Sequence, residues 1–392
     1  GAVLVTTNPA VNRLEGNVAV TVGDYDLRRF EGAINIPLGD RAAIRIAAVR
    51  SIRNGYLKNR ATGYDTNDEN YDAERVTFKW EPVDGIENVL YVNRLHSDDH
   101  GSATQVYAVA APAANASQAV IDRTNRIRAE IAVNKRDNWR FGSDMEGFGK
   151  AKTWDATNIT TIDLGNNLTL KNIFGYRHVK TDSSYDLDGS SEFIQRQVAG
   201  ATDVKQISDE LQLSGTSESF DWLIGAFYFR EKGSDVADSF AVATPTTRSS
   251  SGVVDVVNTS YSAFASGTYR FTDALSISAG ARITRDKREG FGIQRRVNET
   301  TGIVTCGFSN NGVVIAPPCL TAQNASFTQP SWSVSLNYKL TPDVLLYAAH
   351  RHGYRSGGIQ SRATTSAASI PFGPEKVNDI ELGIKSSFDL GD

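Results

Sequence analysis

Cationic and aromatic side chains lie close together near the C-terminal end of this 392-residue sequence, at Arg351, His352, Tyr354 and Arg355. Cationic groups attract anions, and aromatic groups add contact surface, so these residues are candidates for binding an anionic ligand at a loop mouth. The alternative interpretation is that they anchor a strand end at an interface, a position that long cationic and aromatic side chains favour.

A second group, His96, Asp98, Asp99 and His100, combines side chains that can bind metals. Ligand geometry matters more than spacing in a flexible loop, so a solvated loop is the default interpretation and no metal is predicted. The Gly-rich run 353–358 lacks a following helix and a Lys-Ser/Thr pair, so it does not match a phosphate-binding loop. With five His and no local Ser/His/Asp arrangement, the sequence predicts a non-enzyme without catalytic residues or a cofactor.

The two cysteines, Cys306 and Cys319, lie in one stretch rich in Gly, Asn and Pro. Close spacing inside a loop favours a local disulfide, which would form in an oxidising compartment. The alternative is a pair of free loop thiols.

Composition excludes several classes of protein. The net charge of −4 gives no general attraction to nucleic acid. No apolar run approaches the roughly 18 residues of a membrane helix, which excludes a helical membrane protein. A membrane β-barrel stays possible, because only alternate residues of its strands must be apolar.

Apolar and polar residues alternate with period two along the chain, as in residues 277–284 and 332–340. Successive strand residues point to opposite faces, so each segment has one apolar and one polar face. No comparable helical stretch is predicted. We expect about fourteen strands, centred on Val20, Ile34, Ile46, Phe78, Tyr91, Ile162, Leu170, Leu211, Phe227, Phe264, Ile277, Leu336, Tyr347 and Leu382.

Short and long connections alternate between these strands. The short ones are rich in Gly, Pro, Asn and Asp and lie at 37–40, 82–85, 165–167, 272–274 and 341–343. The long polar ones are 53–72, 97–155, 181–203, 233–257, 288–326 and 355–374. Aromatic residues near the short turns predict an interfacial girdle: Trp80, Trp222, Tyr269, Phe271, Tyr338 and Phe388. Short turns at one end and long loops at the other are typical of an outer-membrane barrel.

Several stretches resemble one family of such barrels. They are Gly1–Pro9, Arg13–Val18, Gly23–Asp26, Glu31–Leu38, Ser208–Ser214, Tyr347–Gly358 and, as the most specific, Pro374–Lys385. In these stretches the sequence resembles a TonB-dependent outer-membrane receptor, and the resemblance covers essentially the whole chain. It implies an all-β fold, a transmembrane antiparallel up-and-down β-barrel, of which this sequence holds about 14 of roughly 22 strands. Residues 1–12 would end a plug domain and 13–392 would form part of the barrel, with most of the plug and the last strands missing.

The resemblance implies TonB-energised uptake of a scarce nutrient, a ferric siderophore first of all, across the outer membrane of a Gram-negative bacterium. The TonB–ExbB–ExbD complex would act through the missing plug, and outer-membrane lipid would surround the barrel. Cobalamin, haem or oligosaccharide are alternative ligands, and a passive porin or a soluble β-sandwich or propeller are alternative proteins.

Charged strand residues are unfavourable on the lipid face, since a Lys or Arg there at the bilayer midplane destabilises the folded barrel by about 2–4 kcal/mol. We therefore expect one set to line the lumen: Arg45, Arg75, Lys79, Lys171, Glu210, Arg282, Lys339, Glu381 and Lys385.

Overall fold

The computed structural model describes residues 6–137, 139–360 and 362–387. One large antiparallel sheet dominates it, and all fourteen predicted strands are confirmed as neighbours in chain order. Their bounds are β1 (Glu15–Gly23), β2 (Leu27–Pro37), β3 (Ala42–Arg53), β6 (Glu69–Trp80), β7 (Ile86–Asp99), β9 (Phe148–Gly165), β10 (Leu168–Asp186), β11 (Gln195–Thr216), β12 (Phe220–Ala241), β13 (Thr244–Arg270), β14 (Leu275–Asn298), β18 (Leu320–Thr341), β19 (Val344–Arg355) and β20 (Glu375–Ser386).

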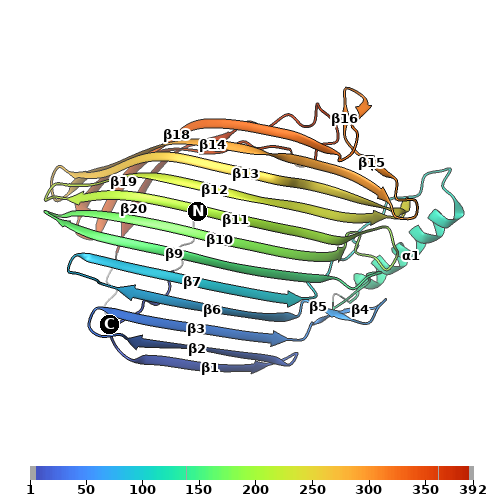
Figure 1. Cartoon of the computed structure of the whole chain (residues 1–392), viewed down its shortest axis with the longest axis horizontal. Coiled ribbons are helices and arrows are strands. Elements are labelled where there is room, and N and C mark those ends of the chain that lie inside the picture. Colours follow the sequence, from blue (N-terminus) through green and yellow to red (C-terminus); the bar gives the residue numbers. More distant parts are fainter. Residues whose placement is uncertain (1–5, 138, 361, 388–392) are drawn as a thin grey trace.

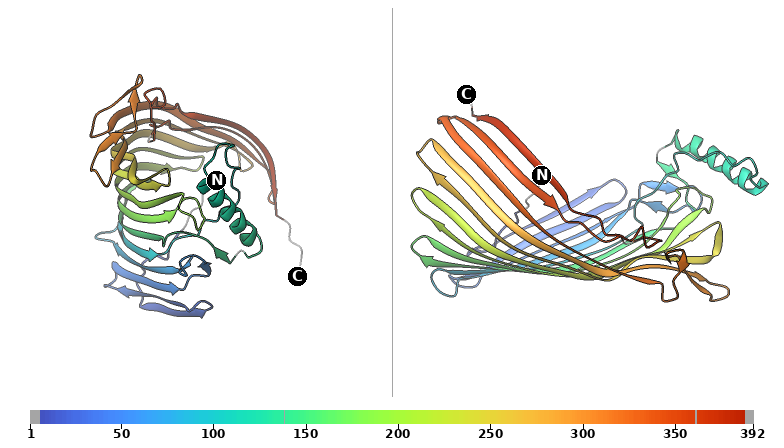
Figure 2. Two further views of the ribbon diagram at one scale, coloured as in Figure 1. Left: turned by 90° about the vertical axis from the view of Figure 1, so that its right-hand side faces the viewer. Right: turned by 90° about the horizontal axis from the view of Figure 1, so that it is seen from above.

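The sheet curves into a trough, with β1 and β20 at its two edges (Figures 1 and 2). Tight turns gather at one end of the strands, and the longer connections lie at the other end together with the two-residue connection between β12 and β13. Between β9 and β10, Asn166 and Asn167 have φ of 54° and 60°, the left-handed values that a two-residue hairpin turn requires. The predicted turn at 389–392 and the girdle residue Phe388 lie outside the described residues.

The predicted absence of helix was wrong. Helix α1 (Gln118–Asn134) lies within the connection between β7 and β9, at the loop end of the trough (Figure 1). Its buried residues, Thr124, Ile127 and Asn134, have helical spacing, but two of the three are polar, so the hydrophobic pattern is weak. Within the described ranges, no helix has the length and apolar character needed to cross a membrane.

One predicted long loop is also absent. Residues 233–257 continue β12 and β13, which are separated by two residues between Ala241 and Thr244. The Ser- and Thr-rich composition favours a loop locally, but the segments pair in register, for example Ala237 with Ser251. Tertiary pairing therefore overrides the local preference. Strands β10, β11 and β14 likewise extend into the predicted loops.

The remaining strands are short. Strands β4 (Leu57–Asn59), β5 (Asp65–Thr66) and β8 (Arg140–Phe141) form a small sheet near α1. Strand β15 (Val304–Cys306) extends the main sheet, and β16 (Ser309–Asn310) pairs with β17 (Val313–Val314). Cys306 and Cys319 form a disulfide, with Cα atoms 5.1 Å apart.

The two faces of the sheet differ in chemistry. Cross-strand register places the nine charged residues predicted for the lumen on one face. The opposite face carries exposed apolar side chains, among them Leu211, Ile224, Leu336 and Leu382. Aromatic residues of this outward face lie near the tight turns, where Tyr269 packs 5.0 Å from Phe271. The alternation predicted from the sequence thus holds across the whole sheet.

Candidate functional site

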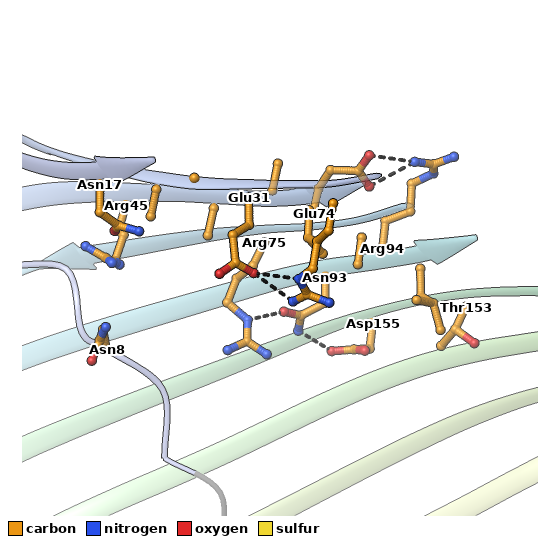
Figure 3. A pocket seen from close by; sticks show the side chains of 18 of the residues that line it. Asn8, Asn17, Glu31, Arg45, Glu74, Arg75, Asn93, Arg94, Thr153 and Asp155 are labelled. Atoms are coloured by element: carbon orange, nitrogen blue, oxygen red, sulfur yellow. Dashed lines mark hydrogen bonds and ion pairs between the residues drawn. The ribbon is translucent and has the colours of Figure 1, made fainter. Parts of the chain in front are cut away.

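A polar row crosses the charged face from one strand to the next. Arg75 donates from Nε to Asn93, and Asn93 donates to Asp155 Oδ2 over 2.6 Å (Figure 3). Asp155 stands opposite Arg177 in the register. These groups line a hollow of about 500 Å³. Arg177 is exposed and has no ion-pair partner in the described part of the chain, so it presents a free cation to that space.

The N-terminal segment lies on this same face. Val11 donates its backbone N–H to Asn35 Oδ1 over 2.9 Å, and the Asn35 amide donates to the carbonyls of Val11 and Arg13. Asn35 is fully buried beneath the segment. Asn8 lies beside Arg45 (Figure 3), and Figure 2 shows the described part of this segment, from residue 6 onward, on the inner side of the trough. The polar face is therefore the concave face, and it holds a strand of chain that precedes β1. The predicted plug boundary at residue 12 stays a prediction, and residues 1–5 lie outside the described ranges.

A second luminal group lies on β12, β13 and β14. The Arg282 guanidinium lies 5.1 Å from the ring centroid of Phe227 and 5.3 Å from that of Phe264. Nearby, the Tyr354 hydroxyl donates to Asp286 Oδ2 over 2.9 Å. A cation held between aromatic rings beside a phenol suits contact with a flat or anionic ligand.

The four residues predicted to bind a ligand do not form one cluster. Arg351 lies on the concave face and pairs with Asp379 and Glu381. His352 lies on the opposite face and stacks on Trp332, with ring centroids 4.0 Å apart. Arg355 lies at the strand end, where its pair with Glu375 spans 3.9 Å and both side chains are exposed. Tyr354 alone joins the Arg282 group.

The predicted solvated loop at residues 96–100 is mostly strand, because β7 runs to Asp99. His96 lies 3.5 Å from Asp72, whereas His100 lies 3.0 Å from Asp68 and 3.4 Å from Glu146. Among the described residues, no group of three or more His, Cys, Asp and Glu is arranged to hold a metal ion.

Sequence reasoning missed a packed assembly at the loop end, which we call the cap. It comprises residues 54–68, 100–137, 139–147 and 187–194. Phe141 and Ile127 form its small apolar core. Arg126 of α1 forms a bidentate pair with Glu192, with distances of 2.6 and 2.9 Å. Glu130 accepts from the backbone and hydroxyl of Ser191.

The base of the cap contains a buried carboxyl group. Asp186 Oδ1 accepts from the N–H groups of Asp188 and Gly189, while Oδ2 is buried without a hydrogen-bond partner within the described ranges. Burial, followed by the nearby Asp188 charge, raises the pKa of Asp186 to about 6. Burial also raises the pKa of Asp144. The Asp-Leu-Asp-Gly run signals this turn, but nothing local identifies its partners.

Comparison with known proteins gives concordant matches. A family model described as TonB dependent receptor-like, beta-barrel, matches residues 85–392. The ferric yersiniabactin uptake receptor FyuA from Yersinia pestis has a TM-score of 0.75 at 15% identity, over 98% of this chain and 53% of that one. The siderophore receptor PiuA from Acinetobacter baumannii has a TM-score of 0.70 at 13% identity, over 97% of this chain and 56% of that one. The closed form of the ferric-catecholate import receptor Fiu from E. coli K12 has a TM-score of 0.68 at 14% identity, over 97% of this chain and 56% of that one. At these identities the likeness concerns the fold, and this chain spans about half of each structure.

Proposed function

Because this chain belongs to the TonB-dependent receptor family, we propose that the whole protein is an energised outer-membrane receptor whose nutrient is a ferric siderophore. The apolar convex face would contact lipid of a Gram-negative outer membrane, and the charged concave face would enclose the lumen. The TonB–ExbB–ExbD complex would supply energy through a plug that docks on that concave face. The residues 1–12 would then be the end of this plug.

One observation carries the proposal: the concave wall binds a preceding chain segment by specific hydrogen bonds. Asn35 is buried, and its side-chain amide forms hydrogen bonds with the backbone of two residues of that segment, Val11 and Arg13. An open diffusion pore needs an aqueous lumen rather than a wall that is built to hold polypeptide. A closed lumen in turn requires an energised opening step, which favours active uptake.

The chemistry required is binding and release, without covalent change. The cap and the loop end would capture the ligand first. Arg177 and the Arg282–Tyr354 group would then attract its anionic and aromatic parts along the wall. Of the residues predicted as ligand contacts, we retain Tyr354 and Arg351 on the concave side. His352 and Arg355 fit the strand-anchoring role better, given the Trp332 stack and the exposed strand end.

Uptake by the full-length protein tests the proposal. The full-length protein would be expressed in Gram-negative cells that lack other siderophore receptors. The cells would then be given radioactive iron bound to hydroxamate, catecholate or phenolate siderophores, one siderophore at a time. We expect at least one to be accumulated, and deletion of TonB to reduce accumulation to background. Uptake that persists without TonB, or a steadily open conductance in liposomes, would support a porin instead. Uptake of haem, cobalamin or oligosaccharide alone would change the ligand class.

A matched pair of variants tests the luminal contact. Arg177→Gln removes a free cation from the concave face, and we expect ferric-siderophore affinity to fall about tenfold. Lys180→Gln removes the same charge three residues away on the convex face and should change affinity less than about twofold. Equal effects of the two variants would contradict the assignment of the concave face to the ligand and of the convex face to lipid.

A further inference from the structure

The convex face of β11 to β14 carries an apolar band with aromatic residues at both borders. At the turn end, Phe220 and Tyr269 lie 6.4 Å apart between ring centroids. At the loop end, Tyr228 and Tyr261 lie 5.4 Å apart. Small and apolar side chains fill the space between the two borders, among them Ala265.

The height of this band matches a membrane. Tyr261 and Tyr269 are eight positions apart on β13, which is roughly 27 Å along the strand at about 3.4 Å per residue. Strands of such barrels tilt by about 35–45°, so the band is roughly 20 Å tall, close to the known apolar height of about 25 Å. The Tyr228–Tyr261 pair therefore marks the outer border of the hydrocarbon layer.

Cationic side chains lie directly at and beyond that outer border. On β11 and β12 they are Lys205, Arg230 and Lys232, and on β14 they are Arg285 and Lys287. The register places Arg230 level with Thr259 and Lys287, and Arg285 level with Tyr261. All five share the convex face, and four of them are exposed.

The geometry of this cluster is unfavourable without an anion. Lys205 and Lys232 stand directly opposite one another across β11 and β12. Like charges at such a pair destabilise a sheet. None of the five cations has an ion-pair partner in the part of the chain that the structure describes, and the acidic Asp203 nearby already bonds His178 over 2.8 Å.

The other flank of the sheet is different at a similar height. There the convex face carries Arg50, Arg94 and Lys150, each of which has an acidic partner. A fourth convex cation, Lys152, has no ion-pair partner among the described residues and stands opposite Lys180. Arg94 lies 2.6 Å from Asp72, and Lys150 lies 3.1 Å from Asp98. Most convex cations on this flank are thus paired within the protein, whereas none of the five on β11, β12 and β14 is paired among the described residues.

We propose that Lys205, Arg230 and Lys232, flanked by Arg285 and Lys287, bind the phosphate groups of an outer-leaflet glycolipid. The inference rests on the membrane orientation in the proposed function. Acyl chains of the lipid would lie on the apolar band, and its phosphates would bridge the opposed lysines. Ammonium and guanidinium groups at this height match phosphate in charge and in hydrogen bonding. The acidic residues Asp209 and Glu289 lie at the two borders of the cationic cluster and so define its extent.

Lipid binding by the full-length receptor tests this site. The receptor would be reconstituted in phosphatidylcholine nanodiscs and titrated with lipid A that carries both phosphates, and with the same lipid after phosphate removal. We expect the phosphorylated form to bind at least about tenfold more tightly. The triple variant K205Q/R230Q/K232Q should lose about tenfold in affinity for it, whereas R50Q/R94Q/K150Q, which removes the same charge from the paired flank, should lose less than about twofold.

The outcomes separate this proposal from the receptor function. Equal affinity for both lipids, or equal loss in both triple variants, overturns the proposal. Competition by inorganic phosphate at a concentration comparable to that of the lipid would also overturn it, because the site would then be a free-anion site. A wild-type protein that transports iron yet shows no phosphate preference would leave the proposed function intact. One that binds the phosphorylated lipid but transports nothing would refute the function alone.

Discussion

The strand wall and the cap are held together by different interactions. Each interior strand of the wall pairs with two neighbours, and strand lengths reach 27 residues in β13. Strands of the cap are two or three residues long, and the cap depends on a few side chains such as Phe141 and Arg126. Backbone ladders do not depend on the identity of one residue, but a small core does. The wall should therefore be a permanent scaffold and the cap a part that can open.

The largest expected effect is loss of the cap core. Phe141→Ala removes a ring that is 2% exposed, which typically costs about 3–5 kcal/mol. We expect hydrogen exchange to lose protection in 57–66 and 118–134, while β12 and β13 stay protected. Trp139→Ala, at a neighbouring residue that is 62% exposed, is the control. If the wall loses protection together with the cap, the two regions are not independent.

A charge on the convex face of the wall should have the next largest effect. Ala265 lies midway across the apolar band, so Ala265→Arg should destabilise the folded protein in vesicles by about 2–4 kcal/mol. Ser266→Arg adds the same side chain to the concave face and should cost less than about 1 kcal/mol. Urea titration of the full-length protein in phospholipid vesicles measures both. A larger destabilisation by Ser266→Arg than by Ala265→Arg would mean that lipid contacts the concave face instead of the convex one.

The cap, unlike the wall, should respond to pH through Asp186. Its folded pKa of about 6 is above the usual value of 3.8, so its ionisation opposes the folded cap. The contribution of Asp186 to the stability of the folded cap is thus complete below about pH 4 and is lost as the pH rises through 6, by about 3 kcal/mol. Exchange of 100–110 and 187–194, corrected for the intrinsic rate, should be about tenfold slower at pH 5 than at pH 7.5. Asp186→Asn keeps the acceptor Oδ1 and should remove most of this pH dependence, with a smaller part left from Asp144, whose pKa burial also raises. A dependence of undiminished size in the variant would assign it elsewhere.

The smallest effect concerns an ion pair at the cap surface. Arg126 is largely exposed, so its pair with Glu192 should contribute little to the stability of the cap despite its bidentate geometry. A double-mutant cycle of R126Q and E192Q, read by exchange in 118–134, measures the coupling. We expect the coupling to shrink at high salt. A coupling above about 3 kcal/mol would mean that the cap relies on this pair rather than on its core.

The wall was predictable from sequence because its signal is local. Alternation in 277–284 and 332–340 reports both strand and face, and the register confirms each face. The cap was not predictable, because α1 buries Thr124 and Asn134 on the face where an amphipathic helix normally carries apolar residues.

The site was predictable only in part, for a related reason. Tyr354 and Asp286 are 68 positions apart and on strands that are not neighbours in the sheet, so their hydrogen bond leaves no local pattern. Neighbours in sequence such as Arg351 and His352 were grouped as one site, yet strand alternation divides them between the two faces.

Spin labels on two adjacent residues of β11 test the central claim, that lipid contacts the convex face and the concave face is enclosed. Labels would be attached to Leu211→Cys and Gln212→Cys in the full-length protein in vesicles. We predict that the label at 211 collides more often with oxygen, which dissolves in lipid, than with a water-soluble nickel chelate, and that the label at 212 shows no such preference. A lipid signature at 212 together with a water signature at 211 would contradict the account.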